Sequence, residues 1–430
     1  MVKLVIKGGN QLKGSVKISG SKNSCLPIIA ASILAEEPII LRDVPFLSDV
    51  KNMISVLEHL GVEVNKDEDS LKIQSNHMTR GDLPPYDLIS KMRASFLTAG
   101  PLLARQGEVK LYLPGGCEIG TRPIDLHLKG FKALGAEVDV DHGSVYVRSG
   151  CLTGERIYLD FPSVGATENI MMAAVRARGT TVIENAAEEP EIMDLARFLN
   201  SLGAKVKGAG TKIIKIIGVD ELGGATHAVI PDRIEAGTFM AAAAINRDEI
   251  ILENVITEHL KAVTAKLKEA GAVIEEIAEG KVRVDGRKCY GPLDIKTLPY
   301  PGFPTDMQAQ FMAMLTLAKG TSVVTETIFE NRYMHVNELK RMGANIRIEG
   351  SGAIIQGVES LSGAKVRCTD LRAGASLVLA GLAAQGETEV LQVEHLDRGY
   401  SRLDEKFYKL GADIKRIEAE ERSDTSMSLR

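Results

Sequence analysis

The chain has 430 residues, which is too long for one ordinary hydrophobic core and enough for two or three domains. Its 44% hydrophobic and 25% charged residues are typical of a soluble globular protein. The net charge of −5, with acids and bases interspersed, argues against a nucleic-acid or polyanion binder. The five cysteines are far apart and form no CxxC pair, so we expect free thiols rather than a zinc ribbon or a disulfide framework.

The first residues do not resemble a secretory signal. Residues 1–7 alternate like a strand, and the longest apolar run, 26–35, is interrupted by Ser32. That run is well short of the roughly 18–20 apolar residues that span a bilayer. We therefore expect a cytoplasmic protein with no membrane segment, in keeping with free thiols.

A short pattern recurs six times along the chain: an amphipathic run, a glycine, usually an alanine, and then alternating apolar residues. Successive glycines are separated by 74, 68, 68, 72 and 68 residues, and they are Gly61, Gly135, Gly203, Gly271, Gly343 and Gly411. The amphipathic run predicts a helix, the glycine its left-handed C′ residue, and the alternating residues the start of a strand.

Each repeat also contains a helix of small and apolar residues. These segments are 27–34, 94–104, 165–175, 234–245, 305–317 and 371–384. A helix that is apolar almost all round is buried on every side. Strands follow these helices, as at 181–186, 250–254 and 323–327. Six repeats divide into three plus three, which predicts two similar α/β domains, and the composition break at 223–232 is the best position for a crossing between them.

Basic residues stand at the mouths of several of these helices. Lys22 stands two residues after Gly20, at the start of the first helix. This segment could be an anion site, and the alternative is a simple turn. Arg93 and Arg372 enter the second and sixth buried helices, and Arg398 leads into the last amphipathic helix. Each arginine alone suits a solvated or structural role, whereas the set suggests a shared pocket for a phosphate or carboxylate.

The stretch 113–123 reads Leu-Pro-Gly-Gly-Cys-Glu-Ile-Gly-Thr-Arg-Pro, which predicts a shaped loop. Its thiol, Cys117, stands five residues before the cation Arg122, where its pKa can be tuned; an incidental surface cysteine is the alternative. Asp306 begins the fifth buried helix, and the local sequence favours a helix-stabilising carboxylate over a general base.

The histidines show no metal-ligand spacing, and the chain has neither a GxGxxG nor a Walker loop, so we expect no metal and no bound cofactor.

These motifs resemble those of the UDP-N-acetylglucosamine enolpyruvyl transferase family. The matching segments are Lys22-Asn23, 114–123, 163–167, 189–191, 231–235, 303–306, 329–332, 370–372 and 397–400. The resemblance implies a two-domain inside-out α/β barrel with six βαβαββ-type repeats, three per domain. It places residues 22–229, with the Cys117 loop as a lid, in one domain and residues 1–21 with 230–430 in the other. Residues 419–430 are polar and without pattern, which predicts a frayed tail.

The resemblance also implies a reaction. Members of this family transfer the enolpyruvyl group of phosphoenolpyruvate to the 3′-hydroxyl of UDP-N-acetylglucosamine and release phosphate. This is the first committed step of peptidoglycan synthesis, and hence serves cell-wall biogenesis, cell shape and division. The epoxide fosfomycin would be a covalent inhibitor; neither nucleic acid nor membrane is an expected partner, and the oligomeric state stays open.

Residue roles follow from the same resemblance. Cys117 would be the proton donor and Asp306 the base, with Lys22 and Arg398 as further catalytic groups. Phosphoenolpyruvate would be bound by Lys22, Asn23, Arg122, Arg372 and Arg398. The UDP-sugar would be bound by Asn23, Arg93, Arg122, Pro123, Ile124, Asp125, Leu126, Ser163, Val164, Gly165, Asp306 and Ile328. One departure is Phe161, where some members have a lysine that contacts the diphosphate.

Two other functions stay open at this point. The sister transferase that acts on shikimate 3-phosphate shares the fold, but its pattern has a serine at the position of Asn23 and lacks the cysteine loop. A catalytically quiet paralogue with a regulatory role is the second alternative. The joint presence of Lys22, Cys117, Asp306 and Arg398 argues against it.

Overall fold

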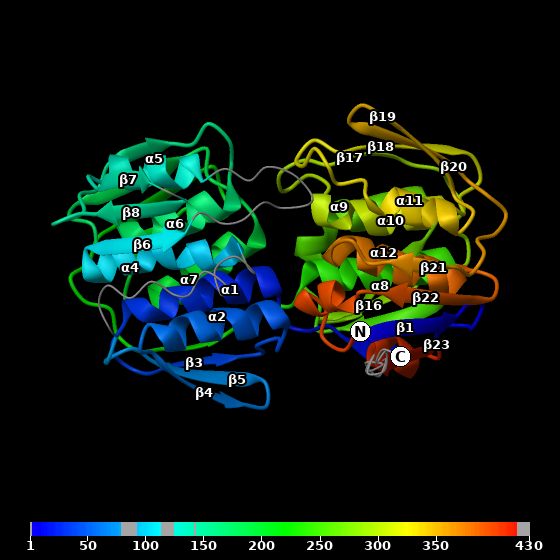
Figure 1. Ribbon diagram of the computed structural model, residues 1–430, viewed down its shortest axis with the longest axis horizontal. Coiled ribbons are helices and arrows are strands. Elements are labelled where there is room, and N and C mark those ends of the chain that lie inside the picture. Colours follow the sequence, from blue (N-terminus) through cyan, green and yellow to red (C-terminus); the bar gives the residue numbers. More distant parts are fainter. Residues whose placement is uncertain (1, 79–92, 113–123, 142, 419–430) are drawn as a thin grey trace, which may run out of the picture.

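The computed structural model describes residues 2–78, 93–112, 124–141 and 143–418, which form two α/β bodies lying side by side (Figure 1). The buried apolar side chains fall into two clusters. One cluster lies within residues 25–229, and the other is built from residues 4–18 and 234–414. We propose residues 22–229 as one domain and 1–21 with 230–430 as the other, a division that the two cores support. The predicted frayed tail, 419–430, lies outside the described residues.

The sheets of the first domain carry eleven described strands. They are β3 (Ile39–Arg42), β4 (Glu63–Asp67), β5 (Ser70–Gln74), β6 (Glu108–Tyr112), β7 (Glu137–Asp141), β8 (Ser144–Arg148), β9 (Arg156–Tyr158), β10 (Thr180–Glu184), β11 (Lys205–Lys207), β12 (Ile213–Ile217) and β13 (Thr226–Ala228). The described helices are α1 (Lys22–Ala31), α2 (Ser48–His59), α4 (Ala99–Gln106), α5 (Asp125–Ala133), α6 (Val164–Ala174) and α7 (Pro190–Ser201), with 3₁₀ segments η1 (Ser32–Leu34) and η2 (Arg93–Thr98).

The second domain repeats this plan. Its strands are β1 (Val2–Lys7), β2 (Ser15–Lys17), β14 (Glu249–Glu253), β15 (Val273–Ala278), β16 (Lys281–Asp285), β17 (Asp294–Lys296), β18 (Thr321–Thr325), β19 (Asn345–Glu349), β20 (Gly352–Gln356), β21 (Lys365–Arg367), β22 (Glu387–Leu391) and β23 (Asp413–Glu418). Its helices are α8 (Arg233–Asn246), α9 (Lys261–Glu269), α10 (Gln308–Leu315), α11 (His335–Arg341), α12 (Leu371–Ala383) and α13 (Leu403–Lys409), with η3 (Thr257–Leu260), η4 (Thr305–Met307) and η5 (Val393–Arg398).

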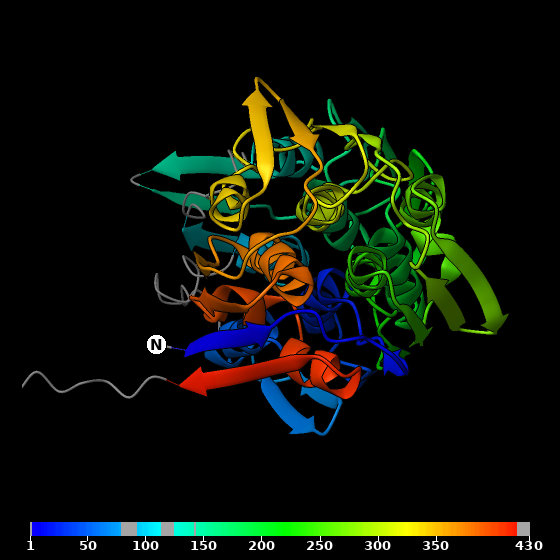
Figure 2. The same cartoon turned by 90° about the vertical axis from the view of Figure 1, so that its right-hand side faces the viewer.

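The helices lie at the centre of each domain and the sheets at its periphery (Figure 2). The predicted helices of small and apolar residues are confirmed as α1, α4, α6, α8, α10 and α12, and most of their residues are buried. Small side chains such as those of Ala241–Ala244 let these helices pack closely in the core. Among the described residues, no helix is long and apolar enough to cross a membrane.

The six repeat glycines all adopt the predicted left-handed conformation. Their φ angles lie between +80° and +107°, in the order Gly61, Gly135, Gly343, Gly411, Gly203 and Gly271 from the smallest to the largest. Each follows the end of a helix and precedes a strand, as the alternating sequence indicates. The sequence repeat is therefore also a repeat of the backbone.

The chain crosses twice between the domains, and the two crossing segments pair with each other. β2 pairs in parallel with β14 of its own domain, and β13 pairs in parallel with β3 of the first domain. Between them Gly20 and Pro231 form an antiparallel bridge, and the N–H of Ser21 donates to the carbonyl of Ile230 at 2.7 Å. A Cβ at Gly20 would lie 1.9 Å from the carbonyl oxygen of Asp43, so this position requires glycine.

Two ion pairs also join the domains beside the crossing. Arg233, the first residue of α8, donates from Nε and Nη2 to the carboxylate of Glu191 on α7 at 3.1 and 3.3 Å. Arg398, at the end of η5, donates from Nε to Asp49 on α2 at 2.9 Å. The domains are thus joined both by the chain and by charged side chains.

A pair of glycine substitutions tests the backbone repeat. At Gly271 an alanine would be strained by φ +107°, and its Cβ would lie 2.4 Å from the carbonyl oxygen of Lys288. At Gly343 an alanine would meet strain from φ +94° but no atom within 4 Å. We expect Gly343→Ala to lower the free energy of unfolding by about 1–2 kcal/mol, and Gly271→Ala to lower it by more. Urea denaturation of both variants measures the difference, and equal losses would contradict the steric argument.

Candidate active site

The first turn of α1 lies where the two domains meet. The Ser21 hydroxyl caps this helix by accepting a hydrogen bond from the N–H of Ser24 at 3.3 Å. The backbone N–H of Lys22 donates to Asp232 Oδ2 at 3.4 Å, and the same Asp232 side chain caps α8. Helices α1 and α8 therefore begin side by side, with Lys22 and Asn23 at the junction of the domains.

The ammonium group of Lys22 lies among other charged groups. Its side chain is 13% exposed, and Nζ lies 3.2 Å from Asp49 Oδ2. Burial lowers the pKa of Lys22, and the nearby guanidinium groups of Arg372 and Arg398 lower it further, whereas the carboxylates of Asp49 and Asp306 act in the opposite direction. The ammonium group of Lys22 therefore lies close to two arginines and two carboxylates.

Asp306 lies in the first helical turn, as the local sequence indicates, but its side chain pairs with two arginines and makes no described capping hydrogen bond. It lies in η4, and its two oxygens accept from Arg332 Nη2 at 2.6 Å and from Arg372 Nη2 at 2.8 Å. Burial raises the pKa of Asp306, but Arg372 and Arg332 outweigh it and hold the pKa well below its usual range. The side chain is therefore a carboxylate at neutral pH.

Arg372 offers unused hydrogen-bond donors at this site. Asp370 caps α12 by accepting from the N–H of Arg372, which fixes the arginine in the first turn of the helix. The side chain is only 3% exposed, and its guanidinium group lies over the ring of Tyr400. Its Nε and Nη1 groups are buried and have no hydrogen-bond partner among the residues that the structure describes. A buried arginine with free donors is suited to a carboxylate or a phosphate.

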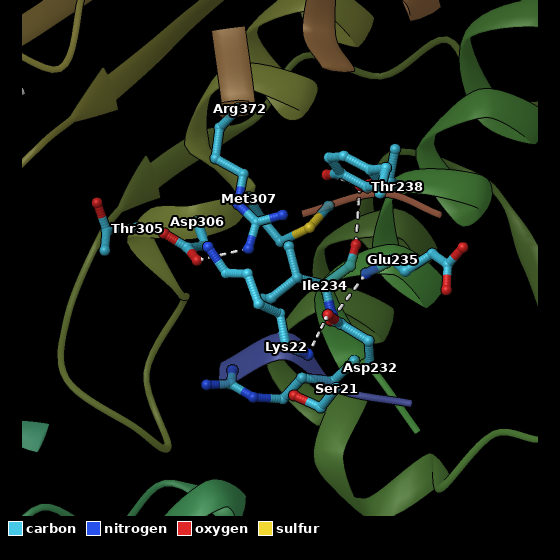
Figure 3. Close-up of polar contacts among 12 residues, drawn as sticks. Ser21, Lys22, Asp232, Ile234, Glu235, Thr238, Thr305, Asp306, Met307 and Arg372 are labelled. Carbon is cyan, nitrogen blue, oxygen red and sulfur yellow. Dashed lines mark hydrogen bonds and ion pairs between the residues drawn. The ribbon is translucent and has the colours of Figure 1, made fainter. Parts of the chain in front are cut away.

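Arg398 completes this group from the other side of Lys22. Its side chain is 41% exposed, and its Nε donates to the same Asp49 carboxylate that pairs with Lys22. The structure therefore brings together Lys22, Asp306, Arg372 and Arg398, four residues that the sequence placed in one site. Lys22, Asp306 and Arg372 converge in Figure 3.

A second group of predicted residues lies at the starts of α5 and α6. Ile124 is the N-cap residue of α5, which begins with Asp125 and Leu126. Ser163 caps α6 by accepting from the N–H of Ala166 at 3.3 Å, and Val164 and Gly165 open that helix. A Cβ at Gly165 would lie 3.2 Å from His127 Cε1, so the two helix starts lie against each other. Unpaired N–H groups at helix starts favour anions.

Ile328 belongs to the opposite domain. Its N–H donates to Glu326 Oε1 at 2.8 Å, and the other oxygen of Glu326 accepts from the hydroxyl of Thr305, the residue before Asp306. Ile328 is therefore connected to the Asp306 segment. No described contact joins it to the α5 and α6 group across the domains.

The remaining predicted residues fall outside this description. Cys117, Arg122 and Pro123, together with the rest of the predicted lid loop 113–123, lie outside the described residues, and nothing is described of the Arg93 side chain. Within the described part of the chain, no group of three or more His, Cys, Asp or Glu side chains could hold a metal ion.

Sequence reasoning missed two residues of this site. Asp49 lies in the first turn of α2, where a carboxylate has an ordinary role and nothing in the local sequence relates it to Lys22. Arg332 occurs in one of the matching segments, but no role was assigned to it. A search for acids and bases that the repeats bring to one junction would have found both.

A polar hollow of about 780 Å³ lies next to the crossing, and it does not contain these groups. It is lined by residues such as Gly20, Asp43, Lys51, Tyr400 and Lys406. Asp49 and Arg398 do not line it, although Ser48 and Asp397, their neighbours in sequence, do. The hollow therefore borders the candidate active site, since Tyr400 lines the hollow and also lies under the guanidinium group of Arg372.

Comparison with known proteins identifies the class. Residues 6–407 match the family model described as EPSP synthase (3-phosphoshikimate 1-carboxyvinyltransferase). Among solved structures, the enolpyruvyl transferase NikO from Streptomyces tendae has a TM-score of 0.88 at 25% identity, covering 97% of this chain and 99% of its own. An EPSP synthase from Acinetobacter baumannii shares the fold, with a TM-score of 0.76 at 21% identity, covering 97% of this chain and all of its own. The chain is an enolpyruvyl transferase with the two-domain α/β fold of that family.

More similar relatives narrow the family. UDP-N-acetylglucosamine 1-carboxyvinyltransferase 1 from Caldanaerobacter subterraneus subsp. tengcongensis is 61% identical over 414 residues, covering 96% of this chain and 99% of the relative. UDP-N-acetylglucosamine 1-carboxyvinyltransferase 2 from Carboxydothermus hydrogenoformans is 59% identical over 418 residues, covering 97% of this chain and all of the relative. The chain belongs to the UDP-N-acetylglucosamine 1-carboxyvinyltransferase family.

Proposed function

We propose that this protein transfers the enolpyruvyl group of phosphoenolpyruvate to the 3′-hydroxyl of UDP-N-acetylglucosamine in the cytoplasm and releases phosphate, as the first committed step of peptidoglycan synthesis. Membership of the family supports the reaction. The observation that carries it within this chain is the gathering of Lys22, Arg372 and Arg398 beside the carboxylate of Asp306.

The cations suit phosphoenolpyruvate. This substrate carries about three negative charges near neutral pH, so several fixed cations are needed to hold it in a site that excludes water. Lys22, Arg372 and Arg398 are assigned to its phosphate and carboxylate, and Asn23 and Arg122 assist. The Nε and Nη1 donors of Arg372 support this assignment, because they are buried and no described residue accepts from them.

Asp306 is assigned as the base. Its low pKa keeps it ionised, which is the form that accepts the proton of the sugar hydroxyl, but a carboxylate paired with two arginines is a weak base. An anion that binds to Arg372 competes with Asp306 for that guanidinium group. Substrate binding therefore raises the pKa of Asp306 and strengthens it as a base.

The addition and elimination steps need an acid as well. The sugar oxygen bonds to C2 of phosphoenolpyruvate as Asp306 takes its proton, and Cys117 gives a proton to the methylene carbon. The adduct then loses phosphate and a proton from the new methyl group, which restores the double bond. The 113–123 loop is assigned as a lid that carries Cys117 over the site when the UDP-sugar is bound. Cys117 is also assigned as the residue that fosfomycin alkylates, because a thiolate is a nucleophile that can open an epoxide.

The UDP-sugar is assigned to the two helix starts of the first domain and to the facing Ile328. The N–H groups at the beginnings of α5 and α6 suit its diphosphate. Arg93, Arg122, Pro123 and residues 124–126 are assigned to this ligand together with residues 163–165. Phe161 supplies no cation there, so the diphosphate contact that lysine makes in some members is either absent from this chain or made by another residue.

Phosphate release with defined acceptors tests the function. With phosphoenolpyruvate present, we expect phosphate release with UDP-N-acetylglucosamine and none with shikimate 3-phosphate. Release with shikimate 3-phosphate would instead indicate the sister reaction. Absence of release with either acceptor, from a folded protein, would indicate a catalytically quiet paralogue.

Replacement of Asp306 tests its role as base. We expect Asp306→Asn to lower kcat by about 10²–10⁴-fold, because the amide cannot accept the hydroxyl proton. The melting temperature shows whether the buried arginines tolerate the change. Asp294→Asn, an exposed substitution on β17 of the same domain, removes the same charge and should leave kcat unchanged. A kcat within threefold of the parent in Asp306→Asn would exclude this carboxylate as the base.

Fosfomycin tests the assignment of the thiol. We expect time-dependent inactivation of the parent protein and resistance in Cys117→Ser. Cys151→Ser is the matched control, because Cys151 is a free and exposed cysteine, and this variant should be inactivated like the parent. Adduct formation is measured by intact mass. Equal rates of modification in the parent and in Cys117→Ser would overturn the assignment.

A further inference from the structure

The carboxylate of Asp49 is buried in the first turn of helix α2, which has one buried face and one partly exposed face. It lies on α2 of the first domain and is only 2% exposed. A carboxylate in such surroundings is costly unless both oxygens are paired. Asp49 meets this condition with two cations, since Oδ2 accepts from Lys22 at 3.2 Å and Oδ1 accepts from Arg398 at 2.9 Å.

The two partners of Asp49 come from different domains. Lys22 opens α1 of the first domain, and Arg398 ends η5 of the second. Lys22 Nζ makes one described hydrogen bond and has three N–H donors, and Arg398 uses only Nε among its described contacts. Each cation therefore keeps donors for a further acceptor while Asp49 sets where its charged head lies.

A purely structural role explains this arrangement less well. A negative charge in the first turn stabilises a helix, but such a role needs neither burial nor two cationic partners. The charged groups that face Lys22 are Asp49 and Asp306, which favour its ammonium form, and Arg372 and Arg398, which oppose it. Asp306 is itself held by two arginines, and Asp232 accepts from the backbone N–H of Lys22, so among the described residues Asp49 is the carboxylate that contacts the ammonium group.

We propose that Asp49 is a positioning residue of the phosphoenolpyruvate site, which fixes Lys22 of one domain and Arg398 of the other as a single anion-binding pair. This inference rests on the proposed function for the identity of the anion. The geometry of the pair is independent of that identity. Asp49 touches neither substrate in this proposal and acts only through the two cations.

The first test measures Lys22 without any substrate. The pH dependence of acetylation of the full-length protein by acetic anhydride, followed by mass spectrometry of the Lys22 peptide, gives the protonation midpoint of this amine. Loss of an adjacent carboxylate removes a stabilising charge from the ammonium form, so the midpoint moves to lower pH. We expect Asp49→Asn to lower it by about one pH unit, and Asp49→Glu to restore most of the change.

A matched variant controls for the lost charge. Asp69 lies in the exposed turn between β4 and β5 of the same domain. Asp69→Asn should leave the Lys22 midpoint and the kinetics at the parent values. Melting temperatures of all variants distinguish a local effect from unfolding.

The second test uses the proposed reaction. We expect Asp49→Asn to lower kcat/KM for phosphoenolpyruvate at least about tenfold at pH 7.5, with a larger loss as the pH rises, and Asp49→Glu to recover part of it. Inorganic phosphate is the probe for simple anion affinity. Its inhibition constant should not rise in Asp49→Asn, because the site has lost a negative charge. The variant would then still attract an anion, but it would no longer orient phosphoenolpyruvate for the reaction.

The outcomes separate this inference from the function on which it rests. A Lys22 midpoint at the parent value in Asp49→Asn, or an equal change in Asp69→Asn, overturns the role of Asp49. A lowered midpoint with normal kcat/KM shows that the pair forms but does not position substrate, which also overturns it. If the parent protein releases no phosphate from phosphoenolpyruvate, the proposed function fails, whereas the acetylation result still decides whether Asp49 controls Lys22.

Discussion

The antiparallel contact between the two crossing segments is the constraint on which the rest of the structure depends. Gly20 and Pro231 bridge the segments, and each segment then runs directly into a buried helix. Both helices start at this point, so their capped N-termini lie together, and Asp232 serves α8 and the N–H of Lys22 at once. The backbone contact between the crossing segments therefore brings residues from two halves of the chain together at this point.

The charges at this junction do not cancel. The four cations of Lys22, Arg332, Arg372 and Arg398 outnumber the three carboxylates of Asp49, Asp232 and Asp306. Buried ion pairs add little to stability, since desolvation offsets much of the attraction. The excess of positive charge is better understood as a binding property: a small anion with several charges completes the pairing that the protein alone leaves unfinished.

The sequence predicted the fold from one periodic signal. The six glycines and six apolar helices follow from local chemistry, because a left-handed helix end needs glycine and a helix without a polar face needs burial. The domain boundary near residue 230 was predicted from a break in composition and from the family resemblance, because nothing in a local pattern says which sheet a strand will join. β13 shows the difficulty, since it pairs with β3, almost 190 residues earlier in the chain.

The site was predicted only in part, because several of its residues pair with partners that are distant in the sequence. The cluster of Lys22, Arg372 and Arg398 was recognised because each stands at a helix start. The local sequence favoured a helix-stabilising role for Asp306, whereas its partners Arg332 and Arg372 are 26 and 66 residues away in sequence. Asp49 was missed because its two partners are 27 and 349 residues away. Short-range patterns do not report such distant pairings.

The position of β1 has a consequence for how the chain assembles on the ribosome. β1 lies between β22 and β23 in its sheet, so both of its neighbours are among the last strands to be translated. The core within residues 25–229 uses no residue from beyond that range and can close while translation continues. The opening strand must wait, unpaired, until nearly all of the polypeptide has emerged, and an unpaired strand is a template for association with other nascent chains.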